Sequence, residues 1–251
     1  MWLLRSQIGD AELRMNEILR LVFLRIQRLF FESAARHRVH PDVWKRTSQE
    51  KEWEFHAANQ WRRSPKFVSD NTRLWQYFGF KSGELRGCTV IDFGAGSKLR
   101  SRFFEEARII AIEPLANRFR ALEFCDLDQA AEVYSQPGEE RIEALVGQAD
   151  LIVSINVLDH CFDFDQAVSN IAAYLRPSGT AFLSFDLHED SDELHPLLLT
   201  EESCKKSFVR AGLVIRRRSE GVGPFGVSYG HGRAINFWLG PAGDNCECTT
   251  S

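Results

Sequence analysis

Residues 90–98, VIDFGAGSK, decide the fold class of this 251-residue chain. They join a β-branched apolar run to a glycine-rich loop, in which Gly94 and Gly96 allow a tight turn and close approach of a ligand to the backbone. In an open α/β sheet, ligands bind at the carboxyl ends of the strands, which is where this loop falls. The stretch therefore predicts a ligand site at the end of a first strand.

Short apolar runs alternate with helical patterns around and after this loop. Strands are expected at 88–94, 108–114, 131–135, 149–157, 179–186, 213–218 and 234–240. Helical patterns lie between them at 115–125, 164–175 and 200–213. This alternation predicts an α/β fold with a mainly parallel sheet that helices cover on both faces. A glycine-rich stretch, 221–232, joins the last two strands in place of a helix and predicts that they pair antiparallel.

The chain divides into an N-terminal helical segment at 1–85, an α/β domain at 86–240 and a flexible tail at 241–251. Within the first segment, apolar residues spaced by three and four positions form one stripe of a helix over residues 10–32. This helix packs on the α/β domain or on a second subunit of a homodimer, or it lies in a membrane interface with its arginines against anionic lipid heads. We favour packing, and the sequence leaves the alternatives open.

A second helical pattern, 48–61, mixes aromatic and polar side chains. They are Trp53, Phe55, His56, Asn59 and Trp61. Such a surface forms either a lid over a substrate pocket or a packing helix with exposed polar positions, and the pattern does not separate the two.

Composition narrows the class of protein. The formal net charge of -4 argues against a dedicated nucleic-acid binder, because phosphate affinity comes mainly from clustered Lys and Arg. The six cysteines show no repeated CxxC spacing, so they predict free thiols in a reducing compartment. No apolar run approaches the roughly 20 residues that span a bilayer, and no signal peptide is evident. We expect a cytoplasmic protein, peripheral at the inner membrane face if the helix at 10–32 binds lipid.

The neighbours of the two glycines indicate which ligand the loop holds. A dinucleotide fingerprint reads GxGxxG, but Leu99 stands at the third glycine position. Asp92 precedes the first glycine, where its carboxylate would repel a pyrophosphate. A ligand with an amino group and a sulfonium centre would tolerate or favour that charge. The loop therefore disfavours NAD and favours S-adenosylmethionine (SAM).

Glu113 ends the second expected strand, about twenty residues past the loop. A carboxylate there accepts two hydrogen bonds from the vicinal hydroxyls of a ribose. NAD-binding and SAM-binding proteins share this feature, so Glu113 predicts that a nucleoside binds but does not distinguish NAD from SAM. Asp92 and Glu113 could each be an ordinary acid at a strand end, but their joint occurrence argues for a site.

The ordered series VIDFGAG, AIEP, DLIVSINVLDH and LRPSGTAFLSF resembles the motifs of class I SAM-dependent methyltransferases over residues 86–215. The resemblance implies a Rossmann-like, seven-stranded, mostly parallel sheet with a reversed last strand, and SAM as cofactor. It implies that Asp92, Gly94 and Gly96 line the methionine end of SAM and that Glu113 holds the ribose. The turn QPGEE is the least well matched, and there Gly138 and Glu139 would contact the adenine.

The fourth strand ends in Asn156, followed by His160. The resemblance places this strand end beside both the methionine moiety and the acceptor. Asn156 could hydrogen-bond the cofactor's amino or carboxylate group. His160 could remove a proton from an acceptor hydroxyl, since an unperturbed imidazole has a pKa of about 6.5. Alternatively, His160 caps or packs the following helix.

Asp186 and His188 follow the fifth strand and are expected on the same edge of the sheet, where with His160 they are the candidate catalytic residues that favour an oxygen acceptor. With His160 and His195 they include residue types that bind metals, but their spacing matches no specific site, so the sequence predicts no metal. In the glycine-rich connection, Tyr229 and His231 are weaker candidates for contact with the acceptor.

These features predict transfer of a methyl group from SAM to an oxygen of a small-molecule or glycan acceptor. The amphipathic N-terminus favours a lipid-linked glycan. Three alternatives stay open: a nicotinamide-dependent oxidoreductase, a non-catalytic SAM-binding or scaffold protein, and a nucleic-acid methyltransferase. The last lacks its usual signature, because NVLDH stands where an acid or amide followed by Pro-Pro and an aromatic residue is expected. Fold alone does not identify the acceptor.

Overall fold

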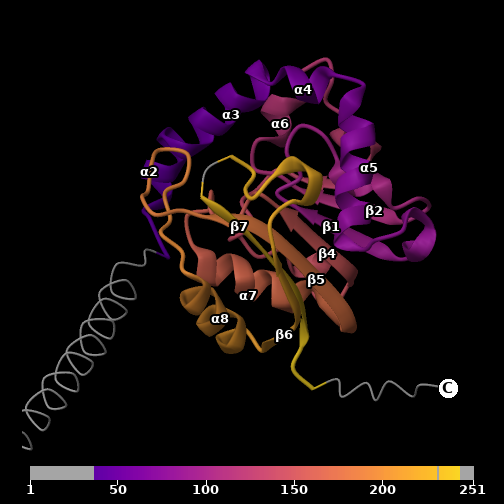
Figure 1. The fold of residues 1–251 in the computed structure, drawn as a ribbon, viewed down its shortest axis with the longest axis vertical. Coiled ribbons are helices and arrows are strands. Elements are labelled where there is room, and N and C mark those ends of the chain that lie inside the picture. The colour runs from indigo at the N-terminus through magenta and orange to yellow at the C-terminus, as the bar shows by residue number, and fades with distance from the viewer. Residues whose placement is uncertain (1–36, 231, 244–251) are drawn as a thin grey trace, which may run out of the picture. The chain divides into compact units, whose positions relative to one another are not determined.

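The computed structural model describes residues 37–230 and 232–243 (Figure 1). The expected helix at 10–32 and most of the expected tail lie outside the described residues. The described part contains a seven-stranded sheet in the order β3-β2-β1-β4-β5-β7-β6. Its strands are β1 (Thr89–Phe93), β2 (Arg108–Ile112), β3 (Glu132–Tyr134), β4 (Ala149–Ile155), β5 (Leu175–Leu187), β6 (Leu213–Glu220) and β7 (Arg233–Pro241).

The pairing of the strands is mostly parallel. β1 pairs in parallel with β2 and β4, and the parallel ladder continues to β3 on one side and to β5 on the other. β7 lies antiparallel to both β5 and β6. The predicted Rossmann-like sheet with a reversed last strand is therefore confirmed. Strand order reverses direction between β1 and β4, and α/β folds bind their ligands outside the carboxyl ends of strands at such a point.

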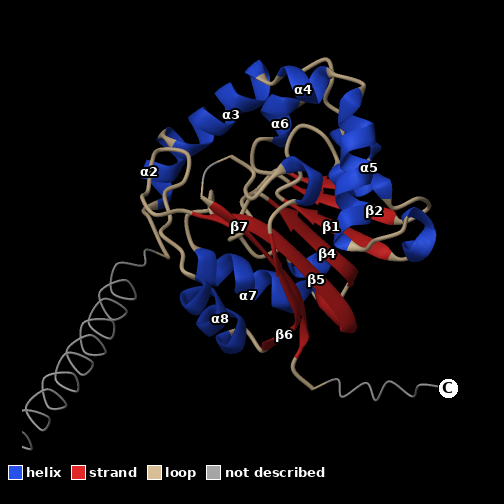
Figure 2. Ribbon diagram, viewed as in Figure 1, coloured by secondary structure: helices blue, strands red, loops and turns tan. Residues whose placement is uncertain are grey.

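Both faces of the sheet are buried because apolar side chains stand at consecutive positions of the strands. On one face, Ile91 and Phe93 of β1 join a core shared with α7 (Phe164–Tyr174) and α8 (Glu201–Arg210). On the other face, Val90 joins a core shared with α5 (Lys66–Phe78). Figure 2 shows α5 and the pair of α7 and α8 on opposite sides of the strands. Helices cover both faces, as predicted.

The connection after β2 is less helical than predicted. The pattern predicts a helix over 115–125, but α6 spans only Ala116–Phe119. Beyond α6 the chain bonds to the glycine-rich loop instead: the backbone N–H of Asp126 donates to the carbonyl of Ser97 (3.3 Å), and its carboxylate accepts from the N–H of Leu99 (2.8 Å). Between α6 and Asp126, the N–H groups of Leu122 and Cys125 bond to carbonyls three residues earlier, so the chain forms turns in place of further α-helix.

Four α-helices precede the sheet in the described residues: α2 (Pro41–Arg46), α3 (Ser48–Ala58), α4 (Gln60–Arg63) and α5. The first three form an arc along one end of the sheet (Figure 1). Among the helices of residues 37–243 that the structure describes, none has the length and apolar character to cross a membrane.

Trp75 anchors α5 to the sheet. Its ring is fully buried against Phe104 and Phe182, with centroid distances of 5.0 and 5.9 Å. Its indole N–H donates to the carbonyl of Arg100 (2.8 Å), the first residue of the 3-10 helix η2 (Arg100–Phe103) that follows the glycine-rich loop. α5 therefore supports the segment that follows the glycine-rich loop.

Replacing Trp75 with Ala should lower the free energy of unfolding by about 3–5 kcal/mol, because it leaves a cavity and removes one of the two hydrogen bonds to the carbonyl of Arg100, which also accepts from Nδ2 of Asn71. Urea titration followed by circular dichroism measures this change. Val68→Ala on the exposed side of the same helix is the matched control, with an expected change within about 0.5 kcal/mol. A Trp75→Ala variant as stable as this control would show that α5 is not an anchor.

Candidate functional site

A cavity of about 470 Å³ opens where β1, β2, β4 and β5 end. Such a volume suits a cofactor or small ligand. The glycine-rich loop and the end of β2 line one part of it, and the segment after β4 lines another. Helices α3 and α4 contribute the opposite wall. The site thus lies at the switch point of the sheet, and α3 and α4 lie across it.

The two loop glycines are sterically required. Gly94 has φ of 79°, and a Cβ there would lie 2.3 Å from Cγ1 of Val157. Gly96 has φ of 65°, and a Cβ there would lie 2.7 Å from Cε1 of His56 on α3. A side chain at either position would strain the backbone and displace a neighbour. Both glycines line the cavity, so the backbone itself is exposed to a ligand.

Glu113 connects the loop to the end of β2. Its Oε2 accepts from the N–H of Gly96 (2.8 Å), and its Oε1 accepts from the N–H of Leu115 (2.9 Å). Each carboxylate oxygen retains capacity for another hydrogen bond, and the residue lines the cavity. Burial raises the pKa of Glu113 to about 7, against the effect of the two N–H donors.

Asp92 lies buried at the end of β1 and also lines the cavity. Its Oδ2 accepts from the N–H of Ser101 (3.2 Å). Burial raises the pKa of this carboxyl above its usual value. The structure therefore brings the two acids expected from sequence to either side of the glycine-rich loop.

Gly138 and Glu139 line the same cavity after β3. A Cβ on Gly138 would lie 2.1 Å from Cζ of Phe93, so this turn packs directly against β1. Oε1 of Glu139 accepts from the N–H groups of Phe162 (2.6 Å) and Asp163 (3.3 Å). The buried carboxyl thus holds the loop after β4, a role that the sequence did not suggest.

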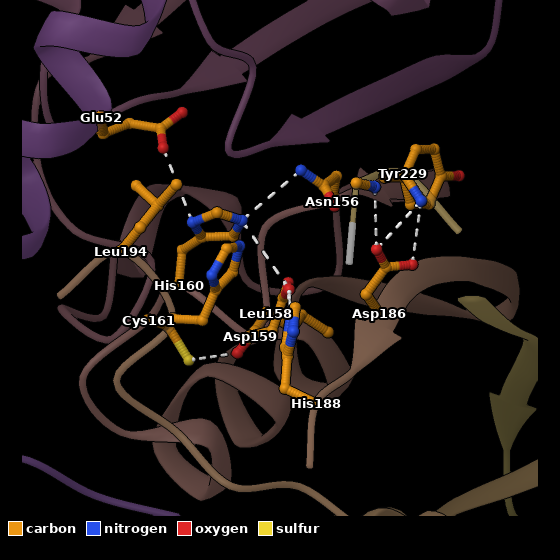
Figure 3. Close-up of polar contacts among 12 residues, drawn as sticks. Glu52, Asn156, Leu158, Asp159, His160, Cys161, Asp186, His188, Leu194 and Tyr229 are labelled. Carbon is orange, nitrogen blue, oxygen red and sulfur yellow. Dashed lines mark hydrogen bonds and ion pairs between the residues drawn. The ribbon is translucent and has the colours of Figure 1, made fainter. Parts of the chain in front are cut away.

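A second polar group, the histidine–aspartate cluster, consists of Asp159 and His160 after β4 with His188 and His195 after β5. Figure 3 labels Asp159, His160 and His188 of this cluster. Asn156, at φ of 57°, places its Nδ2 3.4 Å from Nε2 of His160. The same Nε2 lies 3.7 Å from Oδ2 of Asp159. Nδ1 of His160 lies 3.6 Å from Oε2 of Glu52 on α3. His160 therefore lies between two carboxylates and lines the cavity.

His188 and His195 complete the cluster from the chain after β5. Nε2 of His188 lies 2.8 Å from Oδ2 of Asp159. The ring of His195 lies 4.1 Å from that of His188 and 4.5 Å from that of His160, measured between centroids. Burial opposes ionisation of Asp159, but His160 and His188 hold the pKa of its carboxyl below the usual range. His195 lines the cavity, whereas His188 is outside the lining and supports Asp159.

Asp186 lines the cavity but its carboxylate is engaged by backbone. It accepts from the N–H groups of Tyr229 (2.9 Å) and Gly230 (3.1 Å), as Figure 3 shows for Tyr229. Tyr229 lines the cavity too, and its hydroxyl bonds to Ser184 (2.5 Å). Asp186 thus holds the glycine-rich connection against the site. His231 lies outside the described residues.

The wall formed by α3 and α4 includes most of the residues in the aromatic and polar pattern. Phe55, His56, Asn59 and Trp61 line the cavity. Trp53 instead stacks on Phe119 of α6, with centroids 6.0 Å apart. These four positions therefore face the cavity, and their role as a lid stays a prediction.

Three further residues that line the cavity were not singled out from the sequence as site residues: Glu52 of α3, Arg62 of α4 and Arg100 of η2. Glu52 bonds to His56 (Oε1 to Nε2, 2.9 Å) as well as facing His160. Arg62 and Arg100 both bring guanidinium groups to the cavity. Nε of Arg62 is buried and has no hydrogen-bond partner among residues 37–230 and 232–243. Burial lowers the pKa of Arg62 to about 10, so it remains a cation at neutral pH.

Comparison with known proteins agrees with this geometry. The family model described as "Methyltransferase domain" matches residues 43–212, more than half of the chain. The chain belongs to this methyltransferase family. The recognition of a class I SAM-dependent methyltransferase from its motifs is thus confirmed, and so is SAM as the cofactor. No curated protein matches the chain in sequence.

Solved structures similar to this methyltransferase share its fold at low sequence identity. The PH0226 protein of Pyrococcus horikoshii is 13% identical, with a TM-score of 0.56 over 75% of this chain and 98% of that one. A Listeria monocytogenes protein described as a SAM-dependent methyltransferase is 14% identical, with a TM-score of 0.51 over 67% and 97%. A Haloferax volcanii methyltransferase, solved with the Trm112 methyltransferase activator, is 16% identical, with a TM-score of 0.52 over 73% and 96%.

The buried carboxyl of Glu139 should make the stability of this methyltransferase depend on pH. Burial raises its pKa to about 7 in the folded chain. Since the unfolded carboxyl ionises first, this group's contribution to stability is lost as pH rises from about 4.5 to about 7. Glu139→Gln keeps an oxygen for the two N–H donors and cannot ionise. The free energy of unfolding of Glu139→Gln minus that of wild type should therefore be larger at pH 8 than at pH 5, by up to about 3 kcal/mol.

Urea unfolding at both pH values measures this difference. The exposed neighbour Glu140 provides the control, and Glu140→Gln should shift stability equally at pH 5 and pH 8. An equal offset for Glu139→Gln at the two pH values would contradict the structural role of the carboxyl.

Proposed function

We propose that this methyltransferase transfers the methyl group of SAM to an oxygen of a small-molecule or glycan acceptor. One observation carries the proposal: a single cavity joins the glycine-rich loop and Glu113 to the histidine–aspartate cluster after β4. The first part suits a nucleoside with an amino acid moiety. The second supplies imidazole and carboxylate groups, which assist the loss of a hydroxyl proton.

In this proposal the cofactor occupies the loop side of the cavity. Glu113 accepts from the ribose hydroxyls with the capacity that its two backbone bonds leave free. Asp92 attracts the methionyl amino group. Arg62 pairs with the methionyl carboxylate, which would satisfy its unpartnered Nε. Gly94 and Gly96 let the methionyl chain lie against the backbone, and Gly138 and Glu139 border the adenine.

The acceptor occupies the side of the cavity near Asn156, His160 and Asp186. SAM carries an activated methyl group, so the protein's contribution is alignment and removal of the acceptor proton. The acceptor oxygen bonds to the methyl carbon while the carbon–sulfur bond breaks, and the sulfur of S-adenosylhomocysteine keeps the electron pair. His160 is the cavity-lining imidazole of the cluster with a carboxylate on each side, while Asp186 and His188 support the segments around it.

The class of acceptor and the location of the enzyme are also part of the proposal. A cavity lined by α3 and α4 is closed to large polymers on that side, which favours a small molecule or a terminal sugar over a nucleic acid. The net charge of -4 also argues against a nucleic-acid acceptor. A lipid-linked glycan, a cytoplasmic enzyme peripheral at the membrane through residues 10–32, and a homodimer remain predictions from sequence.

Titration calorimetry with S-adenosylhomocysteine tests the cofactor site. Asp92→Ala, Glu113→Ala and Arg62→Ala should each weaken binding about 10- to 100-fold, since each removes a hydrogen bond to or from a charged group. NAD should not bind, and Glu140→Ala should bind as wild type does. Unchanged affinity in both acid variants would remove the basis of the site assignment.

His160→Ala should separate binding from chemistry. Its affinity for S-adenosylhomocysteine should stay within about twofold of wild type, while methyl transfer should fall by about 10²- to 10⁴-fold, the usual contribution of assisted proton removal. Transfer of a radiolabelled methyl group to a panel of hydroxylated acceptors, beginning with glycans, measures this. Full turnover in His160→Ala with a hydroxyl acceptor would overturn the assignment.

A further inference from the structure

The histidine–aspartate cluster has the composition of a metal site as well as of a proton acceptor. Asp159, His160 and His195 each offer one ligand atom, and these atoms all lie within 4.8 Å of one another. Tetrahedral ligands at the usual zinc distances of about 2.0–2.2 Å lie about 3.3–3.6 Å apart. Side-chain rotations that bring the three atoms up to about 1.5 Å closer together would therefore close the site.

Asp159 has unused capacity to bind a ligand. The residue is 1% exposed, and Oδ1 has no hydrogen-bond partner among the described residues 37–230 and 232–243. Oδ2 accepts from Nε2 of His188. A buried carboxylate oxygen without a partner costs free energy, so an unpartnered Oδ1 points to a ligand that the chain itself does not supply.

His195 is held in the orientation typical of a metal ligand. Its Nδ1 lies 3.1 Å from both carboxylate oxygens of Asp192, and its backbone N–H also donates to Asp192 (2.6 Å). The Nδ1 proton is therefore directed to Asp192, which leaves a lone pair on Nε2. A carboxylate behind a histidine sets the tautomer and raises the basicity of the ligating nitrogen in many metal sites.

His160 shows a related arrangement. Its Nδ1 faces the carboxylate of Glu52 and has no hydrogen bond within the described residues, whereas its Nε2 faces Asp159 (Figure 3). One nitrogen each from His160 and His195 and one carboxylate oxygen of Asp159 thus converge. In turn, Glu52 contacts His160, Asp192 contacts His195, and His188 contacts Asp159. Imidazole and carboxylate ligands together suit zinc and similar divalent transition metals.

We propose that Asp159, His160 and His195 bind one divalent transition-metal ion, with Zn²⁺ as the reference ion. His188 is a positioning residue, because it contacts Asp159 and not the ion. Three protein ligands leave coordination positions open, and His160 and His195 border the cavity where those positions would face.

The ion deepens the proposed function, and its catalytic role rests on that function. With His160 bound to the ion, the ion would replace His160 in assisting proton loss: it would hold the acceptor oxygen and lower the pKa of its hydroxyl, so that the proton passes to water as the oxygen attacks the methyl carbon. The loss of transfer expected for His160→Ala would then come from loss of the ion. The site would therefore select acceptors whose hydroxyl can also coordinate a metal. This reverses the expectation from sequence spacing, which predicted no metal.

Metal titration of the full chain tests the proposal without SAM or acceptor. After treatment with a chelator and its removal, calorimetry with Zn²⁺ should show one ion per chain, and Co²⁺ should give visible absorption bands of a nitrogen- and oxygen-ligated ion. His195→Ala and Asp159→Asn should each weaken binding at least about 100-fold, and His188→Ala about 10- to 100-fold.

Two controls separate this site from other ligands in the chain. His40→Ala removes an exposed histidine elsewhere and should bind the ion as wild type does. Cys246→Ser with Cys248→Ser removes the thiols near the carboxyl terminus and should also retain the one-ion stoichiometry. Circular dichroism of each variant checks that it is folded.

The outcomes for the ion and for the proposed function are distinct. Absence of stoichiometric binding of both ions, or equal binding by folded His195→Ala and Asp159→Asn variants, overturns the metal site, while S-adenosylhomocysteine binding would still support the methyltransferase. Stoichiometric metal binding in a chain that binds no S-adenosylhomocysteine would support the site and overturn its proposed role in methyl transfer. Loss of transfer on chelation, restored by Zn²⁺, would support both.

Discussion

The hydrogen bond from the N–H of Gly96 to the carboxylate of Glu113 is the interaction around which the site is built. It ties the loop after β1 to the end of β2, the neighbouring parallel strand. Because Gly96 has no side chain, His56 of α3 can approach the loop, where its Nδ1 lies 2.8 Å from Oγ of Ser97. The bond holds the glycine-rich loop against the end of β2, and the absence of a side chain at Gly96 lets α3 lie against that loop.

The carboxyl groups around the cavity differ in the direction in which their surroundings shift their pKa values. Burial raises the pKa of Glu113 and of Glu139 to about 7, even though backbone N–H groups donate to both. Histidines beside Asp159 have the opposite effect and hold its pKa low. A cavity with acids of both kinds can bind polar groups of a ligand without accumulating negative charge, and a cationic sulfonium is compatible with such surroundings.

The part of the cavity beside the histidine–aspartate cluster is assembled from separate parts of the chain. Asp159 and His160 follow β4, His188 and His195 follow β5, and Glu52 comes from α3. Burying the side chain of Asp159 or of His188 without a partner would cost free energy, and the contact between the two side chains offsets much of that cost. The orientation of His160 thus depends on contacts among segments more than one hundred residues apart.

Much of the cavity lining around the glycine-rich loop could be predicted from local sequence. Gly94, Gly96, Asp92 and Glu113 stand within or directly after short β-branched runs, and parallel strands bring their carboxyl ends to one edge. The seven strands and their mainly parallel pairing follow from the same alternation of apolar runs and helical patterns. Such features depend on near neighbours in the chain, so the sequence by itself determines them.

Tertiary structure alone decided the rest. Arg62 and Glu52 lie in a helical segment whose residue spacing gives no reason to place them against the loop, and only the packing of α5 and the arc of α2, α3 and α4 does so. α6 is shorter than its pattern, and the chain beyond it leads to Asp126, whose carboxylate accepts from the N–H of Leu99 in the glycine-rich loop. The convergence of Asp159, His160 and His195 matches no ligand spacing, since the sheet, and not the distance along the chain, brings these side chains within reach of one ion.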